Sequence, residues 1–130
     1  MKHTISVLVE NEFGVLSRVV ALFSARGFNI DSINAAPTNE AAISRVTIVS
    51  SGDEKILEQI TKQLNKLIDT IKVIDFTDGS CVEREMALIK VSAEDDSRAE
   101  VLRIVDIFRA KIVDVTPRSY TIEATGSPQK

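Results

Sequence analysis

The fold of this chain is decided by residues 4–27, whose sequence is TISVLVENEFGVLSRVVALFSARG. Ile5, Val7 and Val9 occupy alternate positions, so they share one face of a half-buried strand. Beyond a break at residues 10–14, apolar residues spaced i, i+3, i+4 and i+7 define one face of a helix: Leu16, Val19, Val20 and Phe23. Gly27 follows this segment directly, as is typical of a helix end. The stretch therefore predicts a strand, a turn and an amphipathic helix over 15–26.

The segments that follow complete a βαββαβ order within residues 4–76. Strands are expected at 28–36, 43–50 and 71–76, and a helix that ends near Ile68 precedes the last of them. Ser51 and Glu54 have the spacing of a capping box, in which each side chain satisfies a backbone amide of the other. This order favours a ferredoxin-like unit, with both helices on one face of an antiparallel sheet and the first and third strands at its centre.

A shorter copy of the pattern follows the polar linker 77–80. One strand contains Met86, Leu88 and Val91. A second candidate capping box, Ser97 to Glu100, opens a helix with the apolar stripe Val101, Ile104, Val105 and Phe108. Two strands at 112–115 and 119–122 flank a tight turn. We therefore expect an α+β protein with a ferredoxin-like βαββαβ domain at 1–77 and a partial ferredoxin-like (βαββ) module at 78–130. A lone βαββ unit leaves a sheet edge and a face uncovered, so it needs a partner.

Composition excludes several classes of protein. The chain has 130 residues, of which 44% are hydrophobic, so an ordered globular fold is expected. The net charge is −3 and neither half is basic, which disfavours nucleic-acid binding. No apolar run approaches the roughly 18–20 residues of a membrane span, and the N-terminus lacks a secretory signal, so we expect a cytoplasmic protein. His3 and Cys81 are each the only residue of their type, so we expect no metal site, no cofactor and no Cys/His pair, with His3 solvated. The carboxylates are scattered, and no catalytic residue is indicated.

The turn at residues 10–14 is the candidate binding site. The first amides of the following helix lack partners and carry the positive end of its dipole, which suits a carboxylate or phosphate. Gly14 has no Cβ, so a ligand can approach the backbone. Asn11 offers both a donor and an acceptor, which suits a zwitterion. The alternative is structural: Asn11 forms an Asx-turn and Gly14 only permits the bend.

Asn29 is unusual because asparagine is disfavoured in strands. It is either an edge or turn residue, or a polar group that faces the helix-start loop of a second copy across a two-fold axis.

Longer strings resemble one known family. Residues 9–19 (VENEFGVLSRV) and 22–33 (LFSARGFNIDSI) resemble the amino-terminal ACT domain of the acetohydroxyacid (acetolactate) synthase small subunit. Shorter strings agree across nearly the whole chain: 36–38 (APT), 44–48 (SRVTI), 57–64 (LEQITKQL), 82–85 (VERE) and 112–117 (IVDVTP).

This resemblance implies a non-catalytic regulatory subunit of branched-chain amino acid biosynthesis. It implies binding to the catalytic (large) subunit of a thiamine-diphosphate-dependent acetolactate synthase, activation of that subunit, and feedback inhibition by valine. Effector sites of the family lie between two ACT domains of a homodimer. By position, one chain would contribute Asn11, Gly14, Val15 and Leu16, and the other would contribute Asn29 and Ile30. The family's carboxy-terminal domain continues beyond the position of Lys130, so we expect the second module to be truncated.

Three alternatives share parts of this pattern. A free-standing ACT-domain sensor could regulate another enzyme. An RNA-binding module has the same ferredoxin-like topology, but it needs aromatic residues on its central strands, where this chain has aliphatic residues. A small enzyme of the acylphosphatase type would need an arginine-bearing phosphate loop, and none is evident.

Overall fold

The computed structural model describes residues 1–79 and 81–130. The chain forms two compact units, Met1–Cys81 and Val82–Lys130. Ser80, the last residue of the predicted linker, lies outside the described residues.

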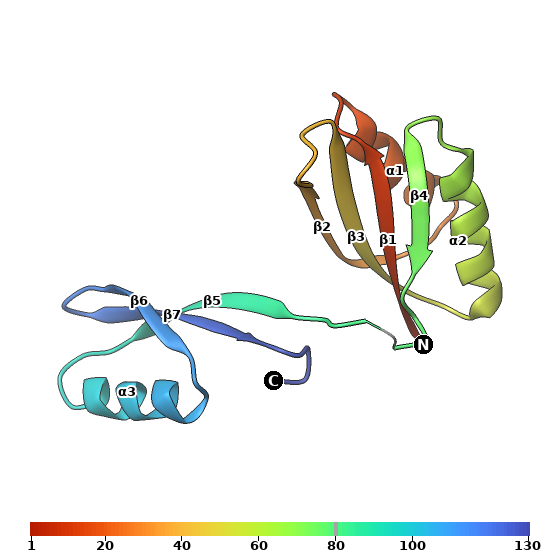
Figure 1. Cartoon of the computed structure of the whole chain (residues 1–130). Coiled ribbons are helices and arrows are strands. Elements are labelled where there is room, and N and C mark those ends of the chain that lie inside the picture. Colours follow the sequence, from red (N-terminus) through yellow and green to blue (C-terminus); the bar gives the residue numbers. More distant parts are fainter. Residues whose placement is uncertain (80) are drawn as a thin grey trace. The chain divides into compact units, whose positions relative to one another are not determined.

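The first unit has the predicted βαββαβ order. Its elements are β1 (Lys2–Glu10), α1 (Val15–Ala25), β2 (Ile30–Pro37), β3 (Ile43–Ser51), α2 (Glu54–Lys66) and β4 (Thr70–Asp75). The strands lie in the order β2-β3-β1-β4, and all neighbours are antiparallel (Figure 1). The prediction that the first and third strands occupy the centre is therefore confirmed.

The core of this unit lies between one face of the sheet and both helices. Ile5 and Val7 of β1 pair with Ile48 and Val46 of β3, and all four side chains are buried. The helices contribute buried side chains to the same cluster: Val15, Val19 and Phe23 from α1, and Ile60 and Leu64 from α2. Burial of each such side chain contributes about 1.5–3 kcal/mol. The predicted stripe of α1 is confirmed only in part, because Val19 and Phe23 are buried, whereas Leu16 and Val20 are 45% and 37% exposed. The face that packs on the sheet is centred on Val15, Val19 and Phe23 instead. The opposite face of the sheet carries no helix (Figure 1).

The start of α2 differs from the prediction. Asp53 is the N-cap, and its side chain accepts a hydrogen bond from the amide of Ile56 at 2.9 Å. Ser51, which was expected to cap the helix with Glu54, ends β3 and donates its hydroxyl to Asp31. The capping box is therefore wrong: once Ser51 is held in the sheet, the helix can begin only after the next strong N-cap residue.

His3 is also placed differently. It was expected to be solvated, yet it is fully buried, and its Nε2 lies 2.9 Å from the carbonyl oxygen of Gly52. The amide of Gly52 in turn donates to the carbonyl of Met1 at 3.0 Å. The imidazole therefore links the first strand to the loop that precedes α2.

The second unit has the predicted βαββ order. It consists of β5 (Glu85–Ser92), α3 (Ser97–Ile107), β6 (Lys111–Val115) and β7 (Ser119–Gly126), with strand order β5-β7-β6. Its buried apolar side chains in the described chain are Ala93, Val105 and Tyr120. Of the expected stripe on α3, Val105 is buried, whereas Ile104 and Phe108 are 46% and 54% exposed.

A polar clamp holds the start of α3. Arg98 donates from Nη1 to the carbonyl oxygens of Ala93, Thr116 and Pro117 at 2.9–3.1 Å, and its guanidinium carbon lies 4.5 Å from the ring centroid of Tyr120. Such a geometry combines charge-assisted hydrogen bonds with a cation–π contact. The clamp joins the helix to the β6–β7 turn, where the apolar core is thin.

The second predicted capping box is wrong as well. No side chain caps α3, because Ser97 donates to the carbonyl of Glu94, and Glu100 forms an ion pair with Arg103 at 2.6 Å. Both side chains thus have partners other than the backbone amides that the motif would supply.

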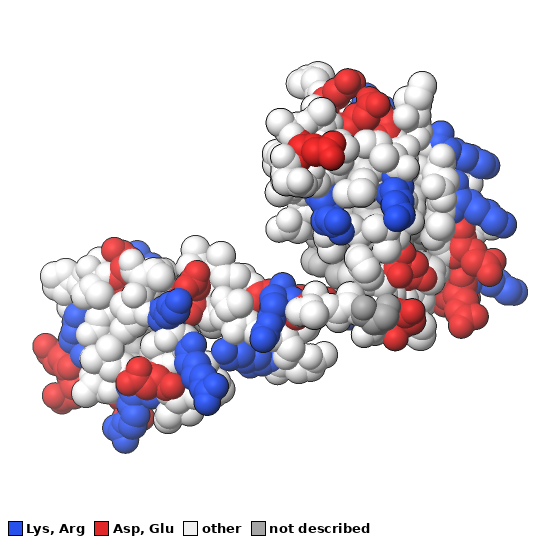
Figure 2. Space-filling model, in the orientation of Figure 1, with Lys and Arg blue, Asp and Glu red and all other residues white. Residues whose placement is uncertain are grey.

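The surface carries charges of both signs on each unit (Figure 2). Within the described residues, we find no helix with the length and apolarity needed to cross a membrane.

Replacement of His3 by alanine tests the role of the buried imidazole. We expect His3→Ala to lower the free energy of unfolding by about 2–4 kcal/mol, because a cavity forms and the Gly52 carbonyl loses its partner. Urea unfolding followed by circular dichroism measures the change. Lys2→Ala, at the exposed neighbouring position, is the control, and an equal midpoint for both variants would contradict the assignment.

Candidate functional site

The loop between β1 and α1 leaves the start of α1 open. Gly14 is the N-cap, with φ of 82° in the left-handed region, and no side chain caps the helix. The amide of Val15 donates weakly to Glu12 at 3.4 Å, whereas the amides of Leu16 and Ser17 have no partner in the described chain. These amides are available to an anion, as the sequence predicted.

Asn11 fastens this loop to the β2–β3 hairpin. Its backbone amide donates to the carbonyl of Ala42, and its Nδ2 donates to the carbonyl of Ala41, both at 2.8 Å. The Asx-turn considered as the structural alternative is thus replaced by a long-range contact. The Oδ1 atom has no partner among the described residues, so Asn11 offers an acceptor to a ligand.

A cavity of about 200 Å³, the loop pocket, lies between this loop, the end of β2 and the start of β3. Asn11, Val15 and Leu16 line it together with residues that were not predicted as site residues: Val9, Glu10, Glu12, Ala35, Ala36, Pro37, Ser44 and Val46. It is smaller than the roughly 300–1,000 Å³ pockets of drug-sized ligands, which suits one free amino acid. Gly14 shapes the loop without lining the pocket.

Asn29 and Ile30 do not reach this pocket within one chain. They lie at the start of β2, whereas the pocket is lined by the end of β2 at residues 35–37. Asn29 is exposed and donates to Asp31 at 2.6 Å, and Ile30 packs partly against the core. Their predicted place in the site therefore depends on a second copy of the chain.

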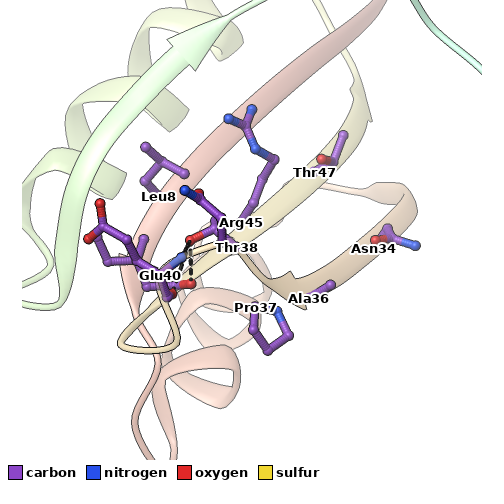
Figure 3. A pocket seen from close by; sticks show the side chains of 10 residues that line it. Leu8, Asn34, Ala36, Pro37, Thr38, Glu40, Arg45 and Thr47 are labelled. Carbon is purple, nitrogen blue, oxygen red and sulfur yellow. Dashed lines mark hydrogen bonds between the residues drawn. The ribbon is translucent and has the colours of Figure 1, made fainter.

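A larger hollow lies on the face of the sheet that has no helix. It measures about 450 Å³ and is lined by Leu8, Arg45 and Thr47, by Asn34 and Ala36 on β2, and by Ile43 and the turn at 37–40 (Figure 3). No spacing in the sequence points to this hollow, because its residues come together only through strand pairing.

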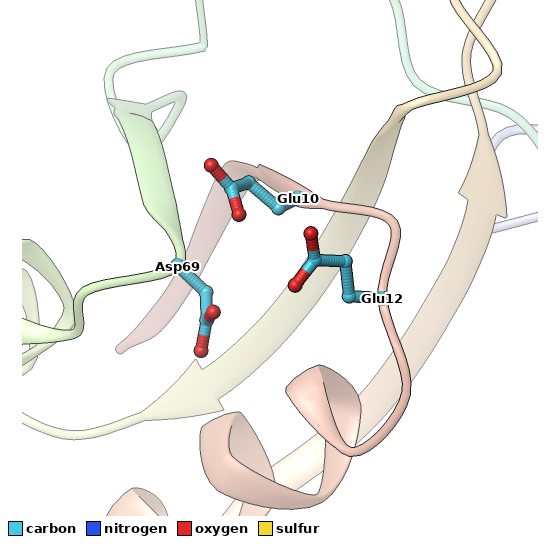
Figure 4. A group of neighbouring side chains, drawn as sticks. All are labelled: Glu10, Glu12 and Asp69. Carbon is cyan, nitrogen blue, oxygen red and sulfur yellow. The ribbon is translucent and has the colours of Figure 1, made fainter.

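Three carboxylates, which looked scattered in the sequence, gather beside the loop pocket (Figure 4). Ligand atoms of Glu10, Glu12 and Asp69 lie within 4.8 Å of one another. Asp69 is largely buried and pairs with Nε of Arg18 at 2.8 Å. The cluster favours a positive group at this end of the pocket, and Arg18 already supplies one to Asp69. We assign no metal to it.

Comparisons with known proteins agree along the chain. The model of the AHAS small subunit-like ACT domain matches residues 5–72, and the model of the small subunit of acetolactate synthase matches residues 84–130. The acetolactate synthase small subunit of Mycobacterium avium is 56% identical over 128 residues, or 98% of this chain and 77% of the relative. The isozyme 3 small subunit of Escherichia coli is 51% identical over all of this chain and 80% of the relative.

A solved structure agrees with the fold. The crystal structure of the small subunit of acetolactate synthase from Thermotoga maritima has a TM-score of 0.92 and 43% sequence identity. The match covers 99% of this chain and 81% of the other.

Substitution of Gly14 tests the backbone of the loop. We expect Gly14→Ala to lower the free energy of unfolding by about 1–2 kcal/mol, because a Cβ is strained at positive φ. The new Cβ would also lie 3.1 Å from Nη1 of Arg18, which is held by Asp69.

Gly27→Ala is the matched control, since Gly27 also has positive φ but has nothing within 4 Å of the added Cβ. Gly14→Ala should therefore lower the free energy of unfolding, measured with urea, more than Gly27→Ala does. In a chain that also carries Arg18→Ala, the two glycine substitutions should lower it by the same amount. Wild-type stability of Gly14→Ala would show that the left-handed turn is not required.

Proposed function

Because the chain belongs to the family of acetolactate synthase small subunits, we propose that it is a regulatory, non-catalytic subunit that confers feedback inhibition by valine. Its proposed partner is the large catalytic subunit, a thiamine-diphosphate-dependent enzyme, which it activates. The single observation that carries the effector site is the uncapped start of α1 over the loop pocket.

The charges around the pocket favour one orientation of the amino acid. The effector carboxylate binds the free amides of Leu16 and Ser17 at the positive end of α1. The ammonium group points toward the free Oδ1 of Asn11 and the carboxylates of Glu10 and Glu12, which line the same cavity. The opposite orientation would place a carboxylate against these acidic groups, and it is therefore disfavoured.

The remaining wall of the pocket suits a branched aliphatic side chain. Val15, Leu16, Ala35 and Pro37 line it, and none of them offers a polar side-chain group. One methylene in such a pocket changes affinity by about 1–3 kcal/mol, so the preference for valine over its homologues is a matter of fit.

A second copy completes the proposed site. Strand β2 is an edge of the sheet, and its residues from Asp31 to Pro37 are exposed. Two β2 strands paired antiparallel across a two-fold axis would bring the start of one strand beside the end of the other. Asn29 and Ile30 of the second copy would then close the loop pocket near Pro37. The homodimer thus explains why site residues lie at opposite ends of one strand.

Regulation requires that valine bind two states of the complex differently. A ligand held between two copies stabilises one dimer geometry, because its contacts on both chains exist only in that geometry. We propose that this geometry is the one that lowers activity of the catalytic subunit.

Calorimetry with L-valine tests the effector site. We expect the full chain to bind L-valine, and Asn11→Ala to weaken binding at least tenfold, because the ammonium group loses an acceptor and the loop loses its tie to the hairpin. L-valinamide, which lacks the carboxylate, should bind no better than the variant does.

Asn65→Ala is the control, since Asn65 is an exposed asparagine whose Nδ2 also donates to a backbone carbonyl, that of Thr61 at 3.0 Å. It should bind like the wild type. No heat with wild type at millimolar valine would overturn the proposed effector, and equal binding by Asn11→Ala would overturn the site. Loss of binding in Asn29→Ala, with a stable dimer, would support the contribution of the second copy.

Reconstitution tests the regulatory role. Addition of the chain to the purified catalytic subunit from the same cells should raise the rate of acetolactate formation and make that rate sensitive to valine. Asn11→Ala should still activate but should need at least tenfold more valine for inhibition. A catalytic subunit that is unchanged by the chain would refute the proposed partnership.

A further inference from the structure

The helix-free face of the first sheet has a consistent surface pattern. Ala36, Arg45, Leu8 and Lys72 lie opposite one another across β2, β3, β1 and β4, so their side chains share this face. The next row consists of Asn34, Thr47, Ser6 and Ile74. We call these two rows the open face. Among the described residues of this unit, no element covers it (Figure 1).

Two cations stand on this face without acidic partners. Arg45 donates from Nη1 to the hydroxyl of Ser6 at 2.8 Å, and Ser6 is buried. The other guanidinium donors of Arg45 bind no acceptor in the described chain, and no carboxylate of that chain lies within ion-pair distance of Arg45 or Lys72. Basic side chains over the strands are visible in Figure 2, with acidic side chains above and below them on the same unit. The bond to Ser6 orients Arg45 before a partner arrives.

The hollow beside Arg45 has the character of a small interface. Leu8 and Ile43 are half-buried and line it with apolar surface, and Asn34 and Thr47 supply neutral polar groups beside them. Arginine beside a desolvated apolar patch is a frequent anchor of protein interfaces, because its planar fork binds a carboxylate through two hydrogen bonds. The face has no aromatic side chain on which a base could stack, so the same cations are unsuited to nucleic acid.

We propose that the open face binds a carboxylate-bearing surface of the catalytic subunit, with Arg45 as the anchor and Lys72 as a second charge. This inference rests on the proposed function for the existence of that partner. A second copy of the chain is a poor occupant, because a two-fold contact centred on this face would bring the same cations together. Ala36 and Pro37 line both the hollow and the loop pocket, so the two sites adjoin. Arg45 and Lys72 do not line the loop pocket, so substitution of these cations tests partner binding apart from effector binding.

Charge reversal tests the assignment. We expect Arg45→Glu combined with Lys72→Glu to weaken binding of the full chain to the catalytic subunit at least tenfold, measured by calorimetry or biolayer interferometry. The affinity of the wild type should fall as salt increases from 50 to 300 mM, because the Debye length becomes about 2.4-fold shorter. The double variant should lose this dependence on salt. Arg45→Lys, which keeps the charge but lacks the fork, should give an intermediate loss.

Two further variants act as controls. Lys62→Glu reverses an exposed charge on α2 and should leave binding unchanged. Glu40 lines the same hollow without an ion pair to Arg45, so Glu40→Gln should bind at least as tightly as wild type. We expect every variant to bind valine like the wild type in calorimetry. That result shows that the loop pocket remains folded in the variants.

The outcomes separate the two proposals. If wild type binds the catalytic subunit and the double variant binds equally well, or if Lys62→Glu weakens binding as much, the open face is not the docking surface. If wild type does not bind the catalytic subunit at all, the partnership fails and this assignment fails with it. If the double variant instead loses self-association in sedimentation, a second copy occupies the face and the assignment is wrong.

Discussion

The register of β1 against β3 is the constraint on which the rest of the first unit depends. Ile5 and Val7 lie opposite Ile48 and Val46, and these four side chains face the helices. A slip by one residue would expose them and turn the alternate positions toward the core. With the register fixed, β1 ends where the turn at 11–14 begins, beside the β2–β3 hairpin. The position of the loop pocket is therefore a consequence of core packing.

Features that depend on neighbouring residues were predicted well from the sequence. The elements of both units followed from apolar spacing, and the strand order of the first unit followed from the handedness of crossovers. The N-cap of α2 did not follow from local sequence, because Ser51 and Asp53 are both good candidates. A contact of Ser51 with Asp31 on another strand decides between them. His3 was predicted to be solvated because a polar residue near a terminus ordinarily is, yet it is buried. The alternation of buried residues in β1 extends from Ile5 to His3.

The candidate site was predicted only in part for the same reason. The open helix start and Gly14 are local features, and the structure has both. The bonds of Asn11 to the hairpin, and the approach of Asp69 to the loop, join residues far apart in sequence. No spacing in a single sequence reports such contacts. The open face is a still clearer case, since Arg45 and Lys72 come to lie on either side of Leu8 only through pairing of their strands with β1.

Under the proposed function, recognition at the start of α1 is divided between backbone and side chains. Every residue except proline has an N–H group, so substitution of Val15 or Leu16 changes the wall of the pocket but keeps the free amides of the helix. Under the proposed function, the amides select amino acids as a class and the side chains select one of them. Evolution could therefore reassign this subunit to a different metabolic signal through a few exchanges in the wall, while Gly14 stays fixed.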